Sequence, residues 1–204
     1  MSLNTDLVTR VRSNINESSS VQSPRRTDAE ILRWLQDAQL DYVHRIPKEQ
    51  LPEIQASVTF SGESVSLPAD YLFYYACRVN HTISGTYTEI VDCFVINPGE
   101  DYFRDHYPSL MGAWAQIVDE ALQVGPNVIS GTLSYIQTPT DISTTNSVTV
   151  SLGVEHESAI VNYATAMALL KVNDDDSDNY MSLYEGSIAS KGGEAREAKE
   201  IERA

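Results

Sequence analysis

Val154-EHESAIVNYATAMALLK-Val172 is the stretch that decides the fold of this chain. Once the segment is helical, apolar side chains occupy almost all of its circumference, and a helix of that kind must be buried. The stretch therefore predicts a central helix with other elements packed around it. The last residues, Lys191–Ala204, have the opposite character, because Ile201 is their only large apolar side chain. A charged segment of that composition cannot order itself alone, which favours a component of an assembly over a free enzyme.

The composition is that of a globular protein with a large acidic excess. Hydrophobic residues make up 42% of the 204 residues and charged residues 21%, values that allow a sizeable core and exclude a wholly disordered chain. Aspartate and glutamate number 29 against 14 lysine and arginine residues, which gives a net charge of -15. Since DNA coating depends on basic side chains that neutralise phosphates, this charge argues against a DNA-coating protein. It also disfavours binding to anionic membrane surfaces.

Two features bear on the compartment in which the protein is made. Cys77 and Cys93 are the only cysteines. Each lies in an apolar, strand-like context, so we expect buried free thiols in a reducing environment. The opening MSLNTDLVTRVR has no hydrophobic signal core, and no apolar run is long enough for a membrane span. We therefore expect a protein made in a cytoplasm.

Helical periodicity predicts helices at both ends of the chain. The first helix separates apolar from polar side chains: Leu7, Val8, Val11 and Ile15 against Arg10, Arg12 and Asn14. A second helix begins with a capping box, Thr27 and Glu30, and ends before Pro47. After the central helix, a last helix begins near Ser177 and is expected to fray at Gly192-Gly193.

A β-rich region lies between the helices. Residues 54–60 and 65–67 flank the turn Ser61-Gly62-Glu63 and predict a hairpin. Further strands are predicted at 72–79, 90–95, 113–119, 121–124, 131–137 and 148–152, and a short helix is predicted at 97–108. The fold class is therefore α+β: a helical bundle of about four main helices, with an antiparallel β-rich insertion between helix 2 and the C-terminal helical pair. We expect N-terminal helices at 1–50, the insertion at 51–152, the helical pair at 153–190 and a flexible charged tail at 191–204.

One acidic cluster follows the spacing of a calcium-binding loop. Asp174, Asp176, Asp178 and Glu185 fall at positions 1, 3, 5 and 12 of an EF-hand loop, although Asn179 replaces the glycine expected at position 6. The other interpretation is an acidic connector whose carboxylates cap the following helix, with Glu185 on that helix. We favour the connector and predict no metal site. A calcium-binding or ligand-binding module, resting on Asp174–Glu185, is the alternative.

No set of residues predicts catalysis. Glu155-His156-Glu157 lacks the second histidine that the zinc motif H-E-x-x-H requires, and it predicts the polar first turn of a helix. There is neither a phosphate-binding glycine loop nor a G-x-S-x-G elbow. The four histidines are scattered: His44, His81, His106 and His156. We expect no catalytic residue, no cofactor and no enzymatic activity.

Four segments, taken in order, resemble one known family. They are Thr27–Tyr42, with an aliphatic-acidic-Ala-Gln centre; Ser64–Val79, with a Leu-Pro-Ala-Asp-aromatic entry to a strand; Gly131–Ile142, a strand in which a proline follows a tyrosine; and the helical pair Val154–Ile188. Their order and spacing are similar to those of the head-to-tail adaptor proteins of tailed bacteriophages. The resemblance covers nearly the whole chain, apart from the stretch Tyr107–Val128.

The resemblance implies a structural virion protein at the head–tail junction. Adaptors of this family form a ring below the portal protein, commonly a dodecamer, and join the portal to the tail nozzle or tube. Genomic DNA passes through the ring during DNA ejection without specific binding, and an acidic lumen would repel its phosphate backbone. The helical part is expected to form the ring and the β-rich part to project toward the tail. Another neck or tail-completion protein of the virion is the alternative.

The resemblance also implies that the C-terminal extension reaches the portal. The candidate portal-interacting residues are Glu194, Arg196, Lys199, Ile201 and Arg203. Charges in this segment alternate at spacings that allow i,i+3 and i,i+4 pairs once it is helical, but an isolated helix of this length is marginal in water. We expect the segment either to become ordered on the portal or to be a frayed, solvated terminus.

Overall fold

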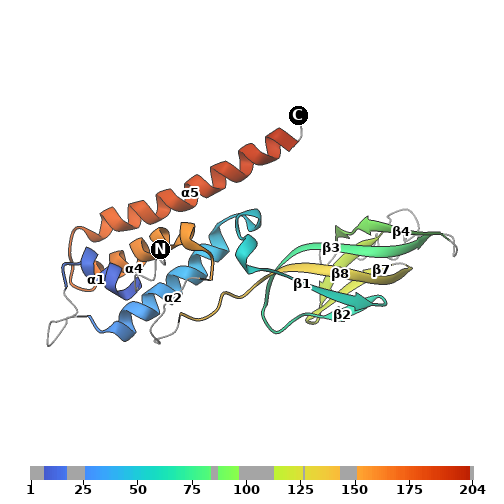
Figure 1. Ribbon diagram of the computed structural model, residues 1–204, viewed down its shortest axis with the longest axis horizontal. Coiled ribbons are helices and arrows are strands. Elements are labelled where there is room, and N and C mark those ends of the chain that lie inside the picture. The colour runs from blue at the N-terminus through green and yellow to red at the C-terminus, as the bar shows by residue number, and fades with distance from the viewer. Residues whose placement is uncertain are drawn as a thin grey trace. The chain divides into compact units, whose positions relative to one another are not determined.

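The chain divides into two compact units. The computed structural model describes residues 7–17, 26–83, 87–96, 113–125, 127–142 and 151–202. A helical unit comprises residues 1–54 and 139–204, and a β-rich unit comprises residues 55–138 (Figure 1). The described residues form four helices and two mostly antiparallel sheets, so the predicted α+β class is confirmed.

The helices of the helical unit begin close to the predicted positions. They are α1 (Leu7–Asn14), α2 (Asp28–Arg45), α4 (Glu157–Leu170) and α5 (Ser177–Glu202), with the short 3-10 turns η1 (Lys48–Gln50), η2 (Pro52–Ile54) and η3 (Val154–His156). The capping box at the start of α2 is confirmed, because Thr27 accepts from the Glu30 N–H and Glu30 accepts from the Thr27 N–H.

Helix α4 is the centre of the helical unit, as predicted. It contacts α1, α2 and α5. Its buried residues are Ala159, Ile160, Val161, Ala164, Thr165, Ala166, Ala168 and Leu169. Four of these are alanines, whose small side chains let neighbouring helices approach closely. Burial ends at Leu170, which is 53% exposed at the last position of the helix.

Two buried arginines and a half-buried glutamate form an ion-pair cluster in the helical unit, and one of the arginines reaches the C-terminal end of α4. Arg26 is 4% exposed, and its Nε donates to the carbonyl of Ala168 at 2.7 Å. Glu17 accepts from Nη1 of Arg26 at 2.5 Å and lies 3.4 Å from Nη1 of Arg12. Arg12, which also bonds Asp28, is buried, so its predicted place on a polar face is wrong. The guanidinium tolerates burial because carboxylates surround it.

The predicted fraying of the last helix at Gly192-Gly193 is also wrong. Helix α5 continues through both glycines to Glu202. Gly192 and Gly193 have open space where a Cβ would lie. A glycine in a helix costs about 1 kcal/mol relative to alanine, and a helix of this length tolerates that cost.

The β-rich unit consists of two sheets that enclose one core. The first sheet is fully antiparallel, in the order β1 (Gln55–Ser61), β8 (Val128–Gln137), β3 (Tyr71–Ile83) and β4 (Tyr87–Asp92). The second has the order β2 (Ser64–Ser66), β7 (Ala121–Gly125), β6 (Trp114–Val118) and β5 (Phe94–Val95), and only the pair β5–β6 is parallel. The core is drawn from both sheets and includes Phe60, Cys77, Val79, Ala115, Leu122, Val124, Leu133 and Tyr135.

The predicted hairpin between residues 54–60 and 65–67 is wrong. Strand β1 pairs with β8 in the first sheet, whereas β2 pairs with β7 in the second. Gly62, at a φ of 82°, turns the chain from one sheet to the other, and its N–H donates to Ile129. Glu63 then accepts from the N–H of Val124. A tight turn in the sequence therefore marks a corner between sheets, because each strand finds a longer partner elsewhere.

Three further predictions need correction or lie outside the described residues. The strand expected at 90–95 is split at Cys93, where the chain leaves the first sheet for the second. The helix expected at 97–108 lies outside the described residues. Of the strand expected at 148–152, only Ser151 and Leu152 are described, and they form a turn.

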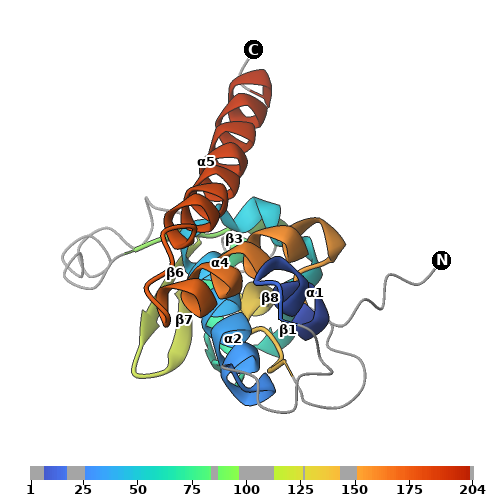
Figure 2. The ribbon, with the colours of Figure 1, turned by 90° about the vertical axis from the view of Figure 1, so that its left-hand side faces the viewer.

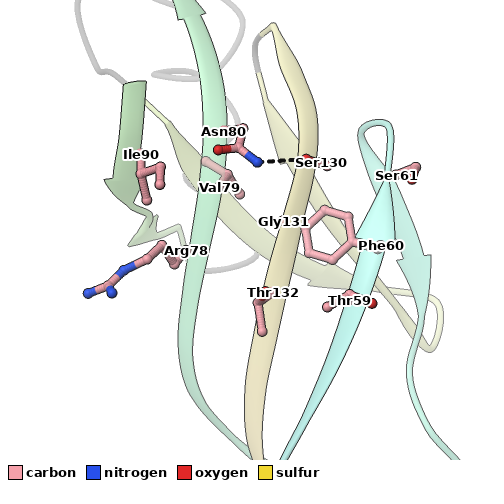
Figure 3. A pocket seen from close by; sticks show the side chains of 10 residues that line it. All are labelled: Thr59, Phe60, Ser61, Arg78, Val79, Asn80, Ile90, Ser130, Gly131 and Thr132. Atoms are coloured by element: carbon pink, nitrogen blue, oxygen red, sulfur yellow. Dashed lines mark hydrogen bonds between the residues drawn. The ribbon is translucent and has the colours of Figure 1, made fainter. Parts of the chain in front are cut away.

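Gly131 on β8 allows the first sheet to pack tightly. A Cβ at this position would lie 2.5 Å from Cζ of Phe60 and 2.9 Å from Cγ1 of Val79. Figure 3 shows the Phe60 ring lying beside Gly131, which has no side chain to obstruct it. The glycine therefore makes room for the aromatic side chain on the neighbouring strand.

Candidate functional site

Two of the segments that carry the resemblance meet in the β-rich unit. The hydroxyl of Tyr135, on β8, donates to Oδ1 of Asp70 at 3.0 Å. The N–H of Thr138 donates to the Asp70 carbonyl at 2.7 Å, and the rings of Tyr71 and Tyr135 lie 5.8 Å apart. Burial raises the pKa of Tyr135, and the hydrogen bond to the Asp70 carboxylate raises it further. Asp70 therefore joins the entry of β3 to the end of β8, which explains the Leu-Pro-Ala-Asp-aromatic pattern.

The glutamines of α2 have a similar role in the helical unit. Gln39 is fully buried and donates to the Thr140 carbonyl at 3.0 Å. Gln36 donates to the Asp141 carboxylate at 3.0 Å and accepts from the N–H of Ile142 at 2.9 Å. The Ala-Gln centre of α2 thus holds residues 140–142 against this helix, ahead of η3 and α4.

The N-terminal turns of α5 are anchored by one buried side chain. Tyr184 is fully buried, and its hydroxyl donates to Oδ2 of Asp41 on α2. Its ring packs edge-on against Tyr163 of α4, with centroids 5.1 Å apart. Beside it, Arg45 makes two hydrogen bonds to the Glu185 carboxylate, one of them 2.8 Å long, and its guanidinium lies 5.7 Å from the Tyr184 ring centroid. These contacts hold α5 to α2 and α4.

The acidic connector has the geometry of a helix start and not that of a calcium loop. The N–H of Asp176 donates to Oδ1 of Asp174, and α5 begins at Ser177. Two of the four positions expected to bind calcium, Asp178 and Glu185, are therefore within the helix, and Glu185 pairs with Arg45. The hydrogen bonds from Arg45 lower the pKa of Glu185. The left-handed residue is Asn173, at a φ of 57°, instead of Asn179. The connector interpretation is confirmed in one respect: Glu185 lies on the helix that follows the connector.

The candidate portal-interacting residues lie on the far turns of α5. Glu194, Arg196, Lys199 and Ile201 are within the helix, whereas Arg203 lies outside the described residues. Positions 194 and 201 share one face of a helix because they are seven residues apart, and positions 196 and 199 share another. The backbone therefore does not bring the candidates to a single face. In Figures 1 and 2 these turns rise away from α1, α2 and α4.

One group of described residues has the donors to hold a metal ion. Glu53 on η2, Glu155 and His156 on η3 place their ligand atoms within 4.8 Å of one another. His156 is 2% exposed, and its Nδ1 lies 3.1 Å from the Tyr42 hydroxyl. Lys191 lines the same groove as Glu155 and brings a positive charge to it. The segment forms the predicted first helical turn ahead of α4, but the His156 side chain is buried against Tyr42 and is not part of a polar surface.

The face of the first sheet carries a shallow pocket of about 530 Å³. Hydroxyl groups of Thr59, Ser61, Ser130 and Thr132 line it, and Asn80 donates to Ser130 at 2.7 Å (Figure 3). Arg78, at its edge, pairs with Asp92 at 2.8 Å. The lining therefore offers hydrogen-bonding groups and no nucleophile with an adjacent base.

The comparison with known families accounts for almost the entire chain. The profile of the SU10 adaptor protein family matches residues 4–203. The chain belongs to the SU10 adaptor protein family. This membership supports a phage structural adaptor protein, the broader part of the resemblance. A comparison with curated proteins gives no match. None of the helices in the described part of this SU10 adaptor has the length and apolar character of a membrane span.

The polar residues that organise this SU10 adaptor were hard to recognise from the sequence. Gln36 and Gln39 lie within the segment Thr27–Tyr42 that carries the resemblance, but their partners follow about 100 residues later in the chain. Glu17 lies in the polar stretch Asn16–Pro24 between two predicted helices, and Arg12 was predicted on the polar face of the first helix. One feature of the local sequence could have indicated their burial: these four polar residues lie within or next to the apolar stripe of a predicted helix.

The buried His156 predicts that this SU10 adaptor loses stability in mild acid. Burial lowers the pKa of His156 from its ordinary value of 6.5, so the unfolded chain binds the proton more readily than the folded chain does. The stabilisation is complete above pH 6.5 and is lost as the pH falls toward the lowered pKa, by up to about 1.4 kcal/mol per pH unit. The charges around the ring are Glu155 and Glu53, which oppose the shift, and Lys191, which reinforces it.

Urea unfolding between about pH 5 and 8 measures this dependence. His156→Asn is expected to flatten the slope below pH 6.5. If the free energy of unfolding depends on pH equally in the parent protein and in His156→Asn, the assignment of this dependence to His156 is wrong.

Proposed function

We propose that this protein is a head-to-tail adaptor, which forms a ring below the portal, joins the portal to the tail and lines the DNA channel. The family match over residues 4–203 is the observation that carries the proposal. The resemblance adds the finer role, because the four segments that carry it follow the order seen in head-to-tail adaptors. In this role the protein is a structural component of the virion at the head–tail junction, with copies of itself, the portal protein and a tail nozzle or tube protein as partners.

The two units of the chain are assigned different roles in the proposed function. The helical unit is assigned to ring formation, because it has one central helix and a long C-terminal helix. The β-rich unit is assigned to contact with the tail. With the boundaries of the two units, the ring part comprises residues 1–54 and 139–190 and the tail contact residues 55–138, in place of the 1–50, 153–190 and 51–152 expected from the sequence. The segment 191–204, which includes the far turns of α5, is assigned to the portal.

The net charge of -15 is compatible with a DNA channel. In a dodecameric ring, acidic groups facing the lumen repel the phosphate backbone and reduce adhesion of the passing genome. The charge also opposes the close packing of many copies in solution. A free subunit that assembles only on the portal is consistent with both effects.

The tail of α5 is the segment that we assign to the portal. Its anchoring side chain is Tyr184, and the candidates Glu194, Arg196, Lys199, Ile201 and Arg203 follow at least ten residues later. Charged groups of both signs allow pairs with a complementary surface, which favour specificity more than affinity. Ile201 supplies the one large apolar contact.

Co-assembly with purified portal tests the proposal. We expect a ring-shaped complex by negative-stain microscopy and a defined stoichiometry by native mass spectrometry. Deleting residues 191–204 is expected to abolish or weaken binding by at least tenfold, about 1.4 kcal/mol, while circular dichroism shows the remaining helices intact. Unchanged binding would remove the role of this segment, and failure of the full chain to bind the portal would contradict the adaptor assignment in favour of another neck or tail-completion protein.

A charge-matched pair of variants sharpens the test. Arg196→Glu with Lys199→Glu reverses two charges among the candidates, and we expect weaker binding with a lower association rate. Arg33→Glu with Lys48→Glu makes the same change in net charge at two exposed positions of the helical unit. Equal losses for both pairs would show a general charge effect instead of a local contact.

A further inference from the structure

The two cysteines of the chain are direct neighbours across the pair β3–β4. Arg78 is opposite Asp92 and Val79 is opposite Val91. Continuing this antiparallel register by one residue places Cys77 opposite Cys93. The Cys93 N–H donates to the Cys77 carbonyl at 2.8 Å, which fixes the register at this point.

Both side chains point into the core between the sheets. Cys77 is 1% exposed and belongs to the core of the β-rich unit, against which the half-buried Cys93 packs. Side chains alternate between the faces of a strand, so Cys77 shares a face with Val79, and Cys93 shares it with Val91. The Cys93 thiol donates to the Cys77 sulfur, and this hydrogen bond lowers the pKa of Cys77.

This geometry meets the main requirement for a disulfide. Directly opposed residues of a hydrogen-bonded antiparallel pair have Cα atoms about 5.5 Å apart, and disulfides span Cα separations of about 4.4–6.8 Å. The two thiols are free in this structure. The expectation of buried free thiols therefore describes the reduced protein, and the register leaves the oxidised form accessible without a change of strand pairing.

We propose that Cys77 and Cys93 are a covalent modification site, which closes to an intramolecular disulfide when the folded protein meets an oxidant of the disulfide class. The inference is independent of the proposed adaptor function. The bond would join β3 to the point at which the chain leaves the first sheet, between β4 and β5.

The reaction with oxidised glutathione proceeds in two exchanges. The Cys93 thiol, on the more exposed of the two residues, passes its proton to the Cys77 sulfur to which it is hydrogen-bonded and attacks one glutathione sulfur. The glutathione S–S bond breaks and releases one glutathione thiolate, which takes this proton from Cys77. The Cys77 thiolate then attacks the Cys93 sulfur and expels the second glutathione thiolate. Two protein thiols are oxidised, one glutathione disulfide is reduced to two thiols, and the two protein protons pass to the released thiolates.

Closure is expected to stabilise the β-rich unit. The bond would restrict the unfolded state of the segment from Cys77 to Cys93, which includes all of β4. We expect the melting transition that includes the β-rich unit to rise by about 5–15 °C on oxidation. The rise should disappear when dithiothreitol is added.

The experiment uses the full chain, oxidised glutathione and N-ethylmaleimide. The folded protein is treated with oxidised glutathione well below its melting temperature, blocked with N-ethylmaleimide under denaturing conditions, and analysed by intact mass and peptide mapping. We expect a mass loss of two hydrogens, no maleimide adduct and a cross-linked peptide pair containing Cys77 and Cys93. Two maleimide adducts, a stable glutathione adduct on Cys93 or a covalent dimer would each overturn the proposal.

A shifted cysteine provides the matched control. Cys93→Ser with Asp92→Cys moves the second thiol by one residue, to the opposite face of the strand, and this variant should form no intramolecular disulfide. Cys93→Ser alone should show no rise in melting temperature on oxidation. It keeps the buried Cys77, so the comparison does not depend on a variant with a disturbed core. An equal yield of disulfide from the shifted variant would also overturn the proposal, because the register would then not select the pair.

Discussion

Tyr184→Ala is expected to lower the free energy of unfolding of the helical unit by about 3–5 kcal/mol. Tyr184 is the largest fully buried side chain of α5, and it fills the space between α2 and α4. Truncation removes the buried ring, leaves a cavity and takes away the hydroxyl that bonds Asp41. Arg45 also loses the ring over which its guanidinium lies. Urea unfolding followed by circular dichroism measures the loss.

Two variants separate the contributions to this loss. Tyr184→Phe keeps the ring and removes only the hydroxyl, so we expect a loss of about 1 kcal/mol. Leu183→Ala removes a large apolar side chain from the adjacent position, which is 57% exposed, and should change stability by less than about 0.5 kcal/mol. Losses of similar size for Leu183→Ala and Tyr184→Ala would contradict the assignment of Tyr184 as the anchor.

The same variant connects the fold to the proposed function. If α5 serves as the arm that reaches the portal, its anchored turns must hold the far turns in place. Tyr184→Ala should then weaken portal binding even though it changes none of the candidate residues from Glu194 to Arg203. Leu183→Ala should leave the binding constant unchanged. A Tyr184→Ala protein that binds the portal like the parent would show that the arm needs no anchor.

Apolar periodicity predicted the helices because each helix buries one continuous face. The segment from Ala159 to Leu169 has too little polar surface for any exposed position, and it is the central helix. The capping box of Thr27 and Glu30 is a local pattern, so it could be read from four residues. These predictions depend only on neighbours within a few turns of the chain.

Strand pairing could not be predicted in the same way. The turn at Gly62 separates two strands that pair with β8 and β7, more than 50 residues later in the chain. Whether a turn closes a hairpin or forms a corner between sheets depends on those distant partners. The split of the predicted strand 90–95 at Cys93 has the same origin, because its two halves belong to different sheets.

Predicting the polar contacts of the helical unit would require knowing which side chains are buried and which distant segments they meet. His156, Arg12 and Gln39 are ordinary polar residues in the sequence, and each is buried against a partner from another segment. The candidate residues of the C-terminal segment were chosen by charge and family resemblance. The helix extends through most of them. Under the proposed function their partners belong to the portal, and a partner in another molecule leaves no pattern in this chain.

Glu17→Ala is expected to destabilise the helical unit by about 3–5 kcal/mol, because it leaves a charge buried without its counter-charge. Arg26 is 4% exposed and Arg12 is 5% exposed, and both guanidinium groups contact the Glu17 carboxylate. Arg26 also donates to the carbonyl of Ala168 in the last turn of α4. A cation in that position stabilises the C-terminal end of the helix through the macrodipole. Loss of Glu17 therefore weakens the support of the central helix.

Three further variants make the expectation specific to buried charge. Glu17→Gln keeps an oxygen acceptor of the same shape, so we expect a smaller loss than for alanine. Lys171→Ala breaks the exposed pair with Glu30 and should change the urea midpoint little. The double variant Glu17→Ala with Arg26→Ala should lose less free energy of unfolding than the sum of the losses of the two single variants. In the double variant both members of the ion pair are removed, so neither remains without its counter-charge. Strict additivity of the two losses would contradict the pairing, since it would mean that Glu17 and Arg26 act independently on the stability of α4.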